Sequence, residues 1–301
     1  MTMTTGNFSR LIAPGYRKVF FGQMKDRPTE YDKIINIKSS TRAYEDDFEM
    51  AGVGAMQSKS EGVAINYSDP IQGGTKRYTH AVFGRGYRIT EEMYEDDLYS
   101  VTGQKMAKSL AKAVANHCEV YGWSVLNNAF STSYAGFIAS TSLCSTSHTL
   151  IDGSTLANRP SAETDLSATA LQAAIESFEG WTDNRGLPVL IKPVLLVIGP
   201  TFKWAAREIL GSEFRPYSSD NEINSLREED MKYMVGHFLS DADSWFVLGG
   251  KDDHDMNWQW RRKPKFENSD DFDTGDAKFK VSLRHSQGYG DFRGVYGSQG
   301  A

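Results

Sequence analysis

The most metal-like run of side chains in the sequence is Asp252–Asp255, in which three carboxylates surround His254. Such groups can bind a divalent ion that activates water, so this run would suit a metal-dependent hydrolase. A hydrolytic site needs ligands that converge from separate elements, however, and these follow one another directly after Gly249 and Gly250, as in an exposed turn. We therefore predict a non-enzymatic protein with no catalytic residue, no metal and no cofactor, and keep the hydrolase as an alternative.

Two shorter motifs resemble catalytic or phosphate-binding sequences but lack the other residues that such sites need. Ser147 and His148 are adjacent, yet no third member and no nucleophile-elbow sequence accompanies them. Gly84 and Gly86 lack the third glycine and the Lys-Ser/Thr pair of a phosphate loop. We interpret His148 as a turn histidine and predict no phosphate site.

Two runs of charge are candidates for contacts with another molecule. The basic run contains Arg261, Arg262, Lys263 and Lys265, and it can face either DNA phosphates or an acidic partner. The acidic run Glu95–Asp97 is one such partner. Its consecutive side chains would leave a helix in different directions, which suits ion pairing better than metal binding.

Composition narrows the class of protein. The 301 residues carry a formal net charge of −6, which argues against a nucleic-acid-binding protein, because such proteins need a basic surface. No apolar run reaches the roughly 20 residues that span a bilayer, and the first residues lack the features of a signal peptide, so we expect synthesis in the cytosol. Cys118 and Cys144 have no metal or redox spacing and are expected to be reduced core thiols.

A long hairpin is predicted over residues 60–89. Glu61–Ser68 alternates like a strand, Asp69–Gly74 contains the proline and glycines of a turn, and Thr75–Ile89 returns as the second strand. Two strands alone are marginally stable in water, and no third strand adjoins them in the sequence. The hairpin therefore needs a partner, which is either another domain or another copy of the chain.

Helices and strands of ordinary length follow the hairpin. Thr90 can cap a short acidic helix over Glu91–Tyr99, and apolar residues at helical spacing predict a long helix from Gln104 to about Phe130. The later elements are a helix after Asp165, buried strand at Val189–Ile191 and Val194–Ile198, a helix Phe202–Leu210, paired strands within residues 231–248 and an alternating strand within residues 276–296. Residues 1–59 show no core pattern. They are expected to be either an arm on a neighbouring surface or an irregular segment packed on its own domain.

Several of these stretches, taken in order, resemble the major capsid proteins of tailed bacteriophages, whose fold is named after phage HK97. The stretches are Phe83–Glu92 followed by Asp96 and Asp97, Leu126–Phe130, Ser145–His148 with Asp152 and Gly153, Pro193–Leu210, Asp243–Leu248, and Gly288–Gly297. The layout is most similar to the major head subunit of Mu-like phages. The resemblance implies an α+β fold with an N-arm, an extended E-loop hairpin, a P-domain built on a long spine helix, and an A-domain.

The resemblance also implies boundaries and a function. The expected parts are the N-arm at residues 1–59, the E-loop at 60–89, the P-domain with its spine helix at 90–165, the A-domain at 166–264, and the closing strands of the P-domain at 265–301. The expected function is that of a structural major capsid protein, made in the host bacterial cytoplasm, that self-assembles into pentamers and hexamers of the icosahedral virion shell around the phage genome. An encapsulin-like compartment shell is the alternative of similar architecture.

The partners implied by the resemblance are many copies of the chain, with a scaffolding protein, a portal and a decoration or cement protein as further candidates. Packaged double-stranded DNA is expected to make only weak contacts with an acidic wall, and no membrane is expected. The residues expected to join copies through the E-loop are Glu61, Tyr67, Asp69, Gln72, Gly73 and Arg77. Ion pairs between copies are expected at the start of the spine helix from Arg85, Arg88, Glu95, Asp96 and Asp97.

Overall fold

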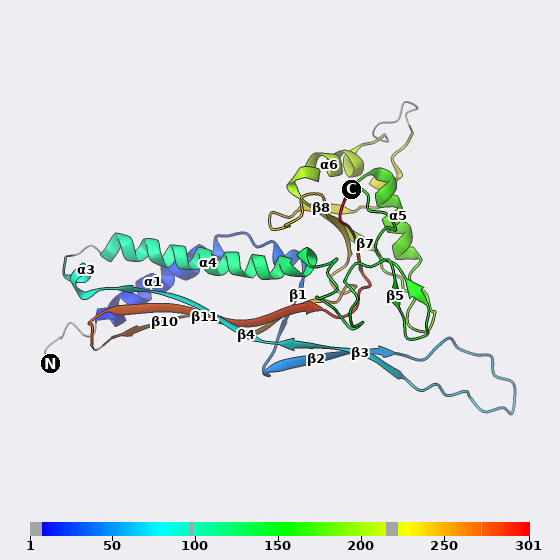
Figure 1. Cartoon of the computed structure of the whole chain (residues 1–301), viewed down its shortest axis with the longest axis horizontal. Helices are drawn as coiled ribbons and strands as arrows, with labels where there is room; N and C mark the ends of the chain where they lie inside the picture. Colours follow the sequence, from blue (N-terminus) through cyan, green and yellow to red (C-terminus); the bar gives the residue numbers. More distant parts are fainter. Residues whose placement is uncertain (1–7, 97–98, 215–221, 272) are drawn as a thin grey trace.

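The predicted long helix is confirmed as α4 (Tyr99–Asn127) in a computed structural model of the chain. The structure describes residues 8–96, 99–214, 222–271 and 273–301. Alanines and straight-chain residues favour the helix, and its 29 residues give a rod of about 44 Å at ~1.5 Å per residue. Figure 1 shows this rod lying along a long sheet, with a second group of elements and a projecting ribbon at the end where α4 finishes.

The long sheet has the strand order β1 (Asn36–Ser39), β10 (Met256–Asp270), β11 (Ala277–Tyr289) and β4 (Ala81–Ile89). β11 confirms the alternating strand predicted near the C-terminus, because Phe279, Val281 and Leu283 are buried while the neighbouring Lys278 and Lys280 are exposed. The buried row belongs to a core shared with α4 and with α1 (Phe8–Lys25). One face of the sheet therefore forms the core, and the alternate side chains point away from it.

The prediction that residues 1–59 lack core elements is wrong for part of this segment. Tyr16 and Phe20 of α1 are buried, and α1 contacts both α4 and β10. Ile34 and Ile35 are completely buried in the same core. β1 then pairs in parallel with β10, from Asn36 opposite Asn257 to Ser39 opposite Trp260. The N-terminal segment is thus part of the body as far as β1.

Glu119 of α4 holds the short helix α2 (Tyr31–Ile34) against the spine. Its carboxylate accepts hydrogen bonds from the backbone N–H of Glu30 (2.9 Å) and Tyr31 (3.0 Å) and from Trp123 Nε1 (3.2 Å). Burial raises the pKa of Glu119, although the three donors oppose the shift. Gly122 leaves room for the same contact, since a Cβ there would lie 2.4 Å from Tyr31 Cβ.

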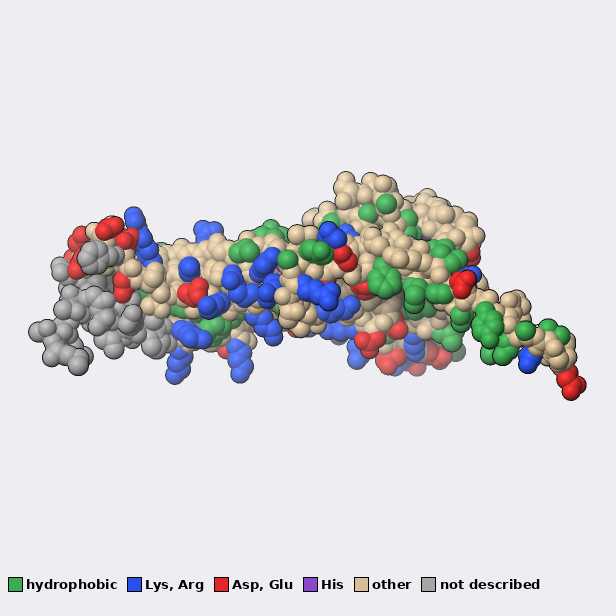
Figure 2. Space-filling view, turned by 90° about the horizontal axis from the view of Figure 1, so that it is seen from below, with side chains coloured by type: hydrophobic (Ala, Val, Ile, Leu, Met, Phe, Trp, Pro, Cys, Tyr) green, Lys and Arg blue, Asp and Glu red, His purple; other side chains and the backbone are tan. Residues whose placement is uncertain are grey.

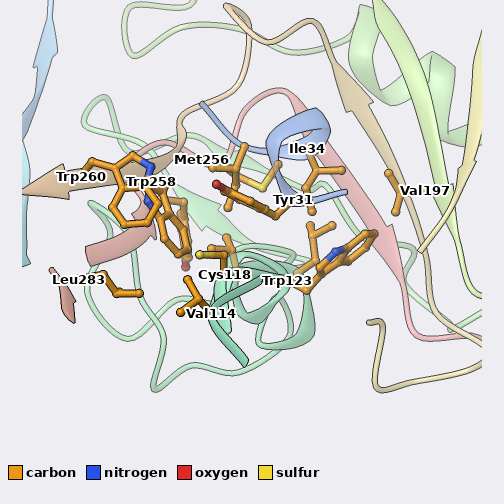
Figure 3. Close-up of a cluster of buried hydrophobic side chains, with 14 of the residues drawn as sticks. Tyr31, Ile34, Val114, Cys118, Trp123, Val197, Met256, Trp258, Trp260 and Leu283 are labelled. Carbon is orange, nitrogen blue, oxygen red and sulfur yellow. The ribbon is translucent and has the colours of Figure 1, made fainter. Parts of the chain in front are cut away.

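Aromatic side chains fill the space where α2, α4 and the long sheet meet (Figure 3). Trp123 and Trp258 are completely buried, and the rings of Tyr31 and Trp258 lie 5.1 Å apart. His285 stacks on Trp258 at 4.1 Å, and burial lowers the pKa of this histidine to about 3. Cys118 lies in the same cluster, and both cysteines are free and buried, which confirms their prediction as core thiols.

A second sheet stands beyond the end of α4. Its strand order is β12 (Val295–Ser298), β9 (Trp245–Gly249), β7 (Pro193–Ile198) and β8 (Lys232–Val235), and it shares a core with helices α5 (Ala168–Glu179) and α6 (Lys203–Gly211). Short 3₁₀ turns at Pro200–Phe202 and Ser225–Arg227 adjoin α6. The predicted strand at β7 and the two predicted helices are confirmed, whereas residues 189–191 form no strand and Leu190 is 94% exposed. The strands predicted to pair within residues 231–248 do not pair with each other, because β7 lies between β8 and β9.

The sheet topology corrects two predicted boundaries. The limit between residues 264 and 265 falls inside β10, all of which belongs to the long sheet. β12 was assigned to the closing strands of the P-domain, yet it pairs with β9 in the second sheet, from Val295 opposite Leu248 to Ser298 opposite Trp245. The chain therefore passes from β9 in the second sheet to β10 and β11 in the long sheet, and then returns to the second sheet as β12. Strands far apart in the chain can pair in this way, because a ladder needs only neighbouring backbones.

Asn158 ties the segment after α4 to the C-terminus. Its side-chain N–H groups donate to the carbonyls of Leu143 and Val295, both at 2.8 Å, and its Oδ1 lies 2.9 Å from His148 Nε2. His148 begins the two-residue strand β5 (His148–Thr149), which pairs with β6 (Thr155–Leu156), and its ring stacks on Phe292 at 3.7 Å. Burial lowers the pKa of His148 to about 4. The predicted turn histidine is therefore a buried structural residue.

Within the described parts of the chain, none of the helices combines the length and the apolar character that a membrane crossing requires.

Candidate assembly surfaces

A hairpin exists, but its first strand lies elsewhere in the sequence, whereas the predicted returning strand Thr75–Ile89 is observed as the end of β3 (Ile71–Thr79) and the whole of β4. β2 (Tyr44–Ala51) pairs antiparallel with β3, from Tyr44 opposite Thr79 to Ala51 opposite Ile71. After His80 the chain continues in the same direction as β4 in the long sheet (Figure 1). Residues 61–68 form no strand, because no other strand lies beside them within the described chain. We call β2, β3 and the connecting residues 52–70 the ribbon.

The end of the ribbon is a preformed turn. The Val63 N–H donates to the Ser60 carbonyl at 3.3 Å, and Gly62 between them has φ +78°, a value that suits the third residue of a type II turn. Asn66 Nδ2 donates across to Gln57 Oε1 at 3.0 Å, so the two limbs of residues 52–70 run side by side in opposite directions. The limbs follow the course of a hairpin without its backbone ladder.

Apolar side chains line the ribbon and find no cover on their own chain. Val63, Ile65 and Tyr67 are 58, 62 and 87% exposed, and Met56 is fully exposed. At the base of the ribbon, Tyr44, Phe48, Met50 and Ile71 are also exposed, to between 43 and 59%. Figure 2 shows hydrophobic side chains along the projecting ribbon out to its tip. Exposed apolar area of this extent is typical of a surface that another molecule covers.

Arg185 fastens both limbs where the ladder ends. Its Nε donates to the Gly52 carbonyl at 3.1 Å, and its Nη2 donates to the Asp69 carbonyl at 2.8 Å. The preceding Asn184 donates to Glu49 Oε1 at 2.6 Å and accepts from Arg293 Nη2 at 3.3 Å. These bonds set the direction in which the ribbon leaves the body, because they tie both of its strands to one loop.

Close backbone contacts fix the other side of the ribbon. A Cβ on Gly74 would lie 1.9 Å from the Phe137 carbonyl oxygen, and one on Gly73 would lie 2.6 Å from Glu49 Oε2. The nearby Lys76 donates to the Ala135 carbonyl at 2.5 Å, and burial lowers its pKa. The glycine pair therefore allows strand β3 to approach the body, which corrects its predicted role as the hairpin turn.

The residues predicted to join copies through the ribbon have different surroundings. Glu61 is exposed in the Ser60–Val63 turn, and Tyr67 is exposed on the second limb, so both are available to a partner. Asp69 meets Arg185 through its carbonyl, and Gln72 lies opposite Met50 in the ladder. Gly73 packs against its own chain, as described above.

Arg77 is already paired across the ribbon. Its Nε and Nη2 each donate to one carboxylate oxygen of Asp46 at 2.7 Å, and its guanidinium lies 4.1 Å from the centre of the Tyr44 ring. The hydrogen bond from Arg77 lowers the pKa of Asp46. The pair remains on the surface, so a contact of Arg77 with another copy would have to include Asp46.

At the start of the spine, Thr90 caps α3 (Glu91–Glu95) through a hydrogen bond from the Met93 N–H at 3.4 Å, as predicted. Arg85 and Arg88 are exposed on β4, and Arg88 lies 3.6 Å from Asp276 of its own chain. Asp96 is exposed, whereas the side chains of Glu95 and Asp97 lie outside the described part. Cross-copy pairing of these residues stays a prediction.

The predicted basic run lies where the β10–β11 ladder is irregular. The register shifts on both sides of Arg262, and Pro264 cannot donate a ladder hydrogen bond. Arg261, Arg262, Lys263 and Lys265 are all exposed. Figure 2 shows lysine and arginine side chains gathered along the long sheet, on its face away from α4. The run is therefore part of a larger cationic surface.

The Asp252–Asp255 run lies at the edge of a cleft of about 1070 Å³ beside the base of the ribbon. His254 is buried, and burial lowers its pKa to about 4. Asp255 accepts a hydrogen bond from Asn257 Nδ2 at 2.5 Å, and burial raises its pKa. In the part of the chain that the structure describes, no group of three or more His, Cys, Asp or Glu side chains is arranged to hold a metal ion.

Sequence reasoning missed the base of the ribbon and its fastening. Phe48 and Met50 alternate with Asp47 and Glu49, which is a weak strand signal. The low β propensity of Asp and Glu conceals this signal. Arg185 carries no sequence signal, because its partners lie 133 and 116 residues away in the chain.

Comparison with known proteins shows which family the chain belongs to. The family described as phage capsid protein matches residues 73–298, which is most of the chain. No curated protein matches the sequence. The family match covers well over half of the chain and therefore shows its family, which is one of structural proteins of the phage capsid.

Similar solved structures confirm the predicted α+β, HK97-like fold. The procapsid of bacteriophage JBD30 is 13% identical with a TM-score of 0.56, over 99% of this chain and 76% of that one. The capsid of cyanophage P-SCSP1u is 12% identical with a TM-score of 0.56, over 91% and 89%. The virus-like particle from Pyrococcus furiosus is 8% identical with a TM-score of 0.52, over 94% and 97%. With its family match and its fold, the chain belongs to the phage capsid protein family.

Proposed function

We propose that copies of this capsid protein form the pentamers and hexamers of an icosahedral shell around the phage genome, with each ribbon lying across a neighbouring copy. The exposed apolar ribbon carries this proposal. Its second limb, Glu61–Ser68, has the sequence pattern of a strand but no neighbouring strand, and a second copy can supply the missing cover. A head-to-tail contact of this kind repeats around an axis and closes into a ring.

The parts of the subunit take roles by analogy with the family. The long sheet with α1 and α4 forms the P-domain, the second sheet with α5 and α6 forms the A-domain near the axis of each ring, and the ribbon is the E-loop. The N-arm would be limited to the residues ahead of the buried part of α1. Contacts spread over several such surfaces sum to a large interface without a dominant hot spot.

The remaining partners follow from the shell. A scaffolding protein, a portal and a decoration protein are candidates, and the subunit would be made in the host cytoplasm before it enters the virion. With a formal net charge of −6, the wall would make weak contacts with packaged double-stranded DNA, which leaves the DNA able to move during packing and ejection.

The direct test is assembly of the purified protein with and without the ribbon tip. In the shortened variant, residues 53–69 are replaced by Asn-Gly, which still joins the ends of β2 and β3. We expect closed particles by electron microscopy from the natural chain and unassembled subunits from the variant, with the same melting temperature for both subunits. Particles of normal size and yield from the variant would refute the role of the ribbon.

The contents of the particle distinguish a viral shell from the compartment alternative. Particles isolated from cells that carry the complete phage should contain nuclease-protected DNA. A compartment shell would enclose cargo protein instead. Substituting Asp252 and Asp253 with alanine distinguishes the shell from the hydrolase alternative. The shell function predicts unchanged assembly, because both side chains are exposed, whereas a hydrolase would lose its activity.

A further inference from the structure

The long sheet has one uncovered face that is strongly cationic. Residues 278–284 of β11 alternate, so the buried row faces the core and the other row faces outward. The outward row and its neighbours on β10 and β4 contain Lys278, Lys280, Arg284, Arg262, Lys265 and Arg88, which we call the cationic face. On β4, Gly84 and Gly86 add no side chains to this surface. A Cβ on Gly86 would lie 2.6 Å from the Phe279 carbonyl oxygen.

Two arginines of the cationic face oppose each other within one subunit. Arg262 is the ladder partner of Arg284. Like charges in directly opposed positions of an antiparallel pair destabilise it. Among the described residues, no carboxylate forms an ion pair with Arg261, Arg262 or Lys263. An anion from outside the subunit would remove this repulsion.

The carboxylates that do lie on this face are too few to neutralise it. Glu267 is within ion-pair distance of Lys265 and of Lys280 (3.8 Å), and Asp271 pairs with Lys278. Asp276 lies 3.6 Å from Arg88. The paired cations stay 48 to 69% exposed, and surface pairs of this kind exchange partners at little cost.

A complementary surface lies at the far end of the same sheet. Residues 90–97 and 270–276 contain many carboxylates and no cation. The two segments are adjacent, since a Cβ on Gly275 would lie 2.1 Å from Glu91 Oε2. The described carboxylates without an ion pair to another described residue are Glu91, Glu92, Asp96, Asp270 and Asp273, which we call the acidic end. Figure 2 shows acidic side chains at this end and basic ones along the long sheet.

We propose that the cationic face of one copy binds the acidic end of another copy. The proposal rests on the shell function proposed above and names one contact within it. Every subunit carries one cationic face and one acidic end, so an assembly contains equal numbers of the two surfaces. Contact between them reduces the repulsion among the like charges within each surface. DNA phosphate is the weaker candidate for the same face, because the nearby acidic end and the net charge of −6 repel it.

A charge-swap experiment tests this contact. Arg262→Glu turns the like pair with Arg284 into an opposite pair, so the melting temperature of the subunit should be unchanged or higher. Assembly should nevertheless need a protein concentration about tenfold higher, which corresponds to roughly 1.4 kcal/mol. Glu92→Lys with Asp273→Lys should have a similar effect on assembly. All three substitutions together should restore assembly to within about threefold of the natural chain.

Lys192→Glu is the matched control, because Lys192 is exposed and lies outside both surfaces. It should assemble like the natural chain. Assembly of Arg262→Glu at the natural concentration would overturn the proposal. So would normal particles of this variant that have lost bound nucleic acid, because the face would then serve DNA. Failure of the natural chain to form particles would contradict the shell function instead.

Discussion

Two segments of this chain alternate apolar residues with polar or small ones, residues 277–285 in the long sheet and residues 63–67 in the ribbon. In the first, Phe279, Val281 and Leu283 are at most 3% exposed, because α4 and α1 cover them and strands flank them on both sides. In the second, Val63, Ile65 and Tyr67 are at least 58% exposed and no strand lies beside them. The same pattern thus has two outcomes, which depend on whether a neighbouring element exists.

The comparison indicates that the body is complete within one subunit and that the ribbon tip is not. Polar contacts such as those of Arg185 fix where the ribbon starts, but they bury little apolar area. Mutations in the body should therefore change the stability of the subunit, whereas mutations in the ribbon should change its association.

The largest effect on the subunit should come from Trp258→Ala. Trp258 is completely buried between Tyr31 and His285, so its removal leaves a cavity and should lower the free energy of unfolding by about 3 to 5 kcal/mol. Urea denaturation followed by fluorescence measures this. Trp204→Ala on α6 is the control, because Trp204 is 63% exposed and its loss should cost less than about 0.5 kcal/mol. Equal losses would contradict the position of the core.

A smaller effect is expected from Glu119→Ala. It leaves the N–H groups of Glu30 and Tyr31 and the Trp123 indole without their acceptor, which should destabilise the subunit by about 1 to 3 kcal/mol. Hydrogen exchange should increase in residues 30–35 in particular. Glu119→Gln keeps an acceptor oxygen and should lose less. If α1 and α2 are instead a mobile arm, neither substitution will change exchange in these residues.

The body should also respond to pH through His285. Its folded-state pKa is about 3, against ~6.5 for the unfolded chain, so its contribution is complete above pH ~6.5 and is lost as the pH falls toward 3. His285→Phe keeps a ring against Trp258 and removes this proton uptake. As the pH is lowered from 6 to 4, the free energy of unfolding should decrease less steeply in this variant than in the natural chain. The difference between the two slopes should be about 1.4 kcal/mol per pH unit. An unchanged pH slope would show that His285 is protonated in the folded state.

The smallest effect on stability should come from Arg185→Ala at the base of the ribbon. Global unfolding should change by less than about 1 kcal/mol, since the lost hydrogen bonds are partly exposed. Limited proteolysis within residues 52–70 should nevertheless become faster, because both limbs lose their fastening. Arg207→Ala, on the exposed side of α6, is the control and should leave proteolysis unchanged. A loss of stability without faster cleavage would place Arg185 in the body.

Local patterns predicted the elements whose own sequence has a clear helical or strand period or a capping residue. The long helix, the cap at Thr90, strand β7 and the alternation of β11 all follow from helical or strand spacing over several residues. The segment of α1 was missed because Pro14 and Gly15 interrupt it in the sequence, although the helix continues through both. Its burial depends on α4 and β10, which no local pattern reveals.

The ribbon shows more clearly what local sequence patterns cannot predict. Glu61–Ser68 has the better strand pattern, but Tyr44–Ala51 forms the strand, because β3 lies beside it and supplies the hydrogen bonds. The exposure of Tyr67 and Glu61 was predictable from their place in an unsupported hairpin, and their contact with another copy stays a prediction. The opposition of Arg262 and Arg284 was not, since it depends on the register of β10 against β11.

Hydrogen exchange of the backbone amides of residues 53–69, compared between free subunits and assembled particles, tests most directly whether the ribbon is completed by another copy. The free subunit should exchange these amides nearly as fast as an unfolded chain, and the particle should slow them at least about tenfold, while amides of β11 stay protected in both. Equal exchange of residues 53–69 in the two states would contradict the division between a complete body and an incomplete ribbon.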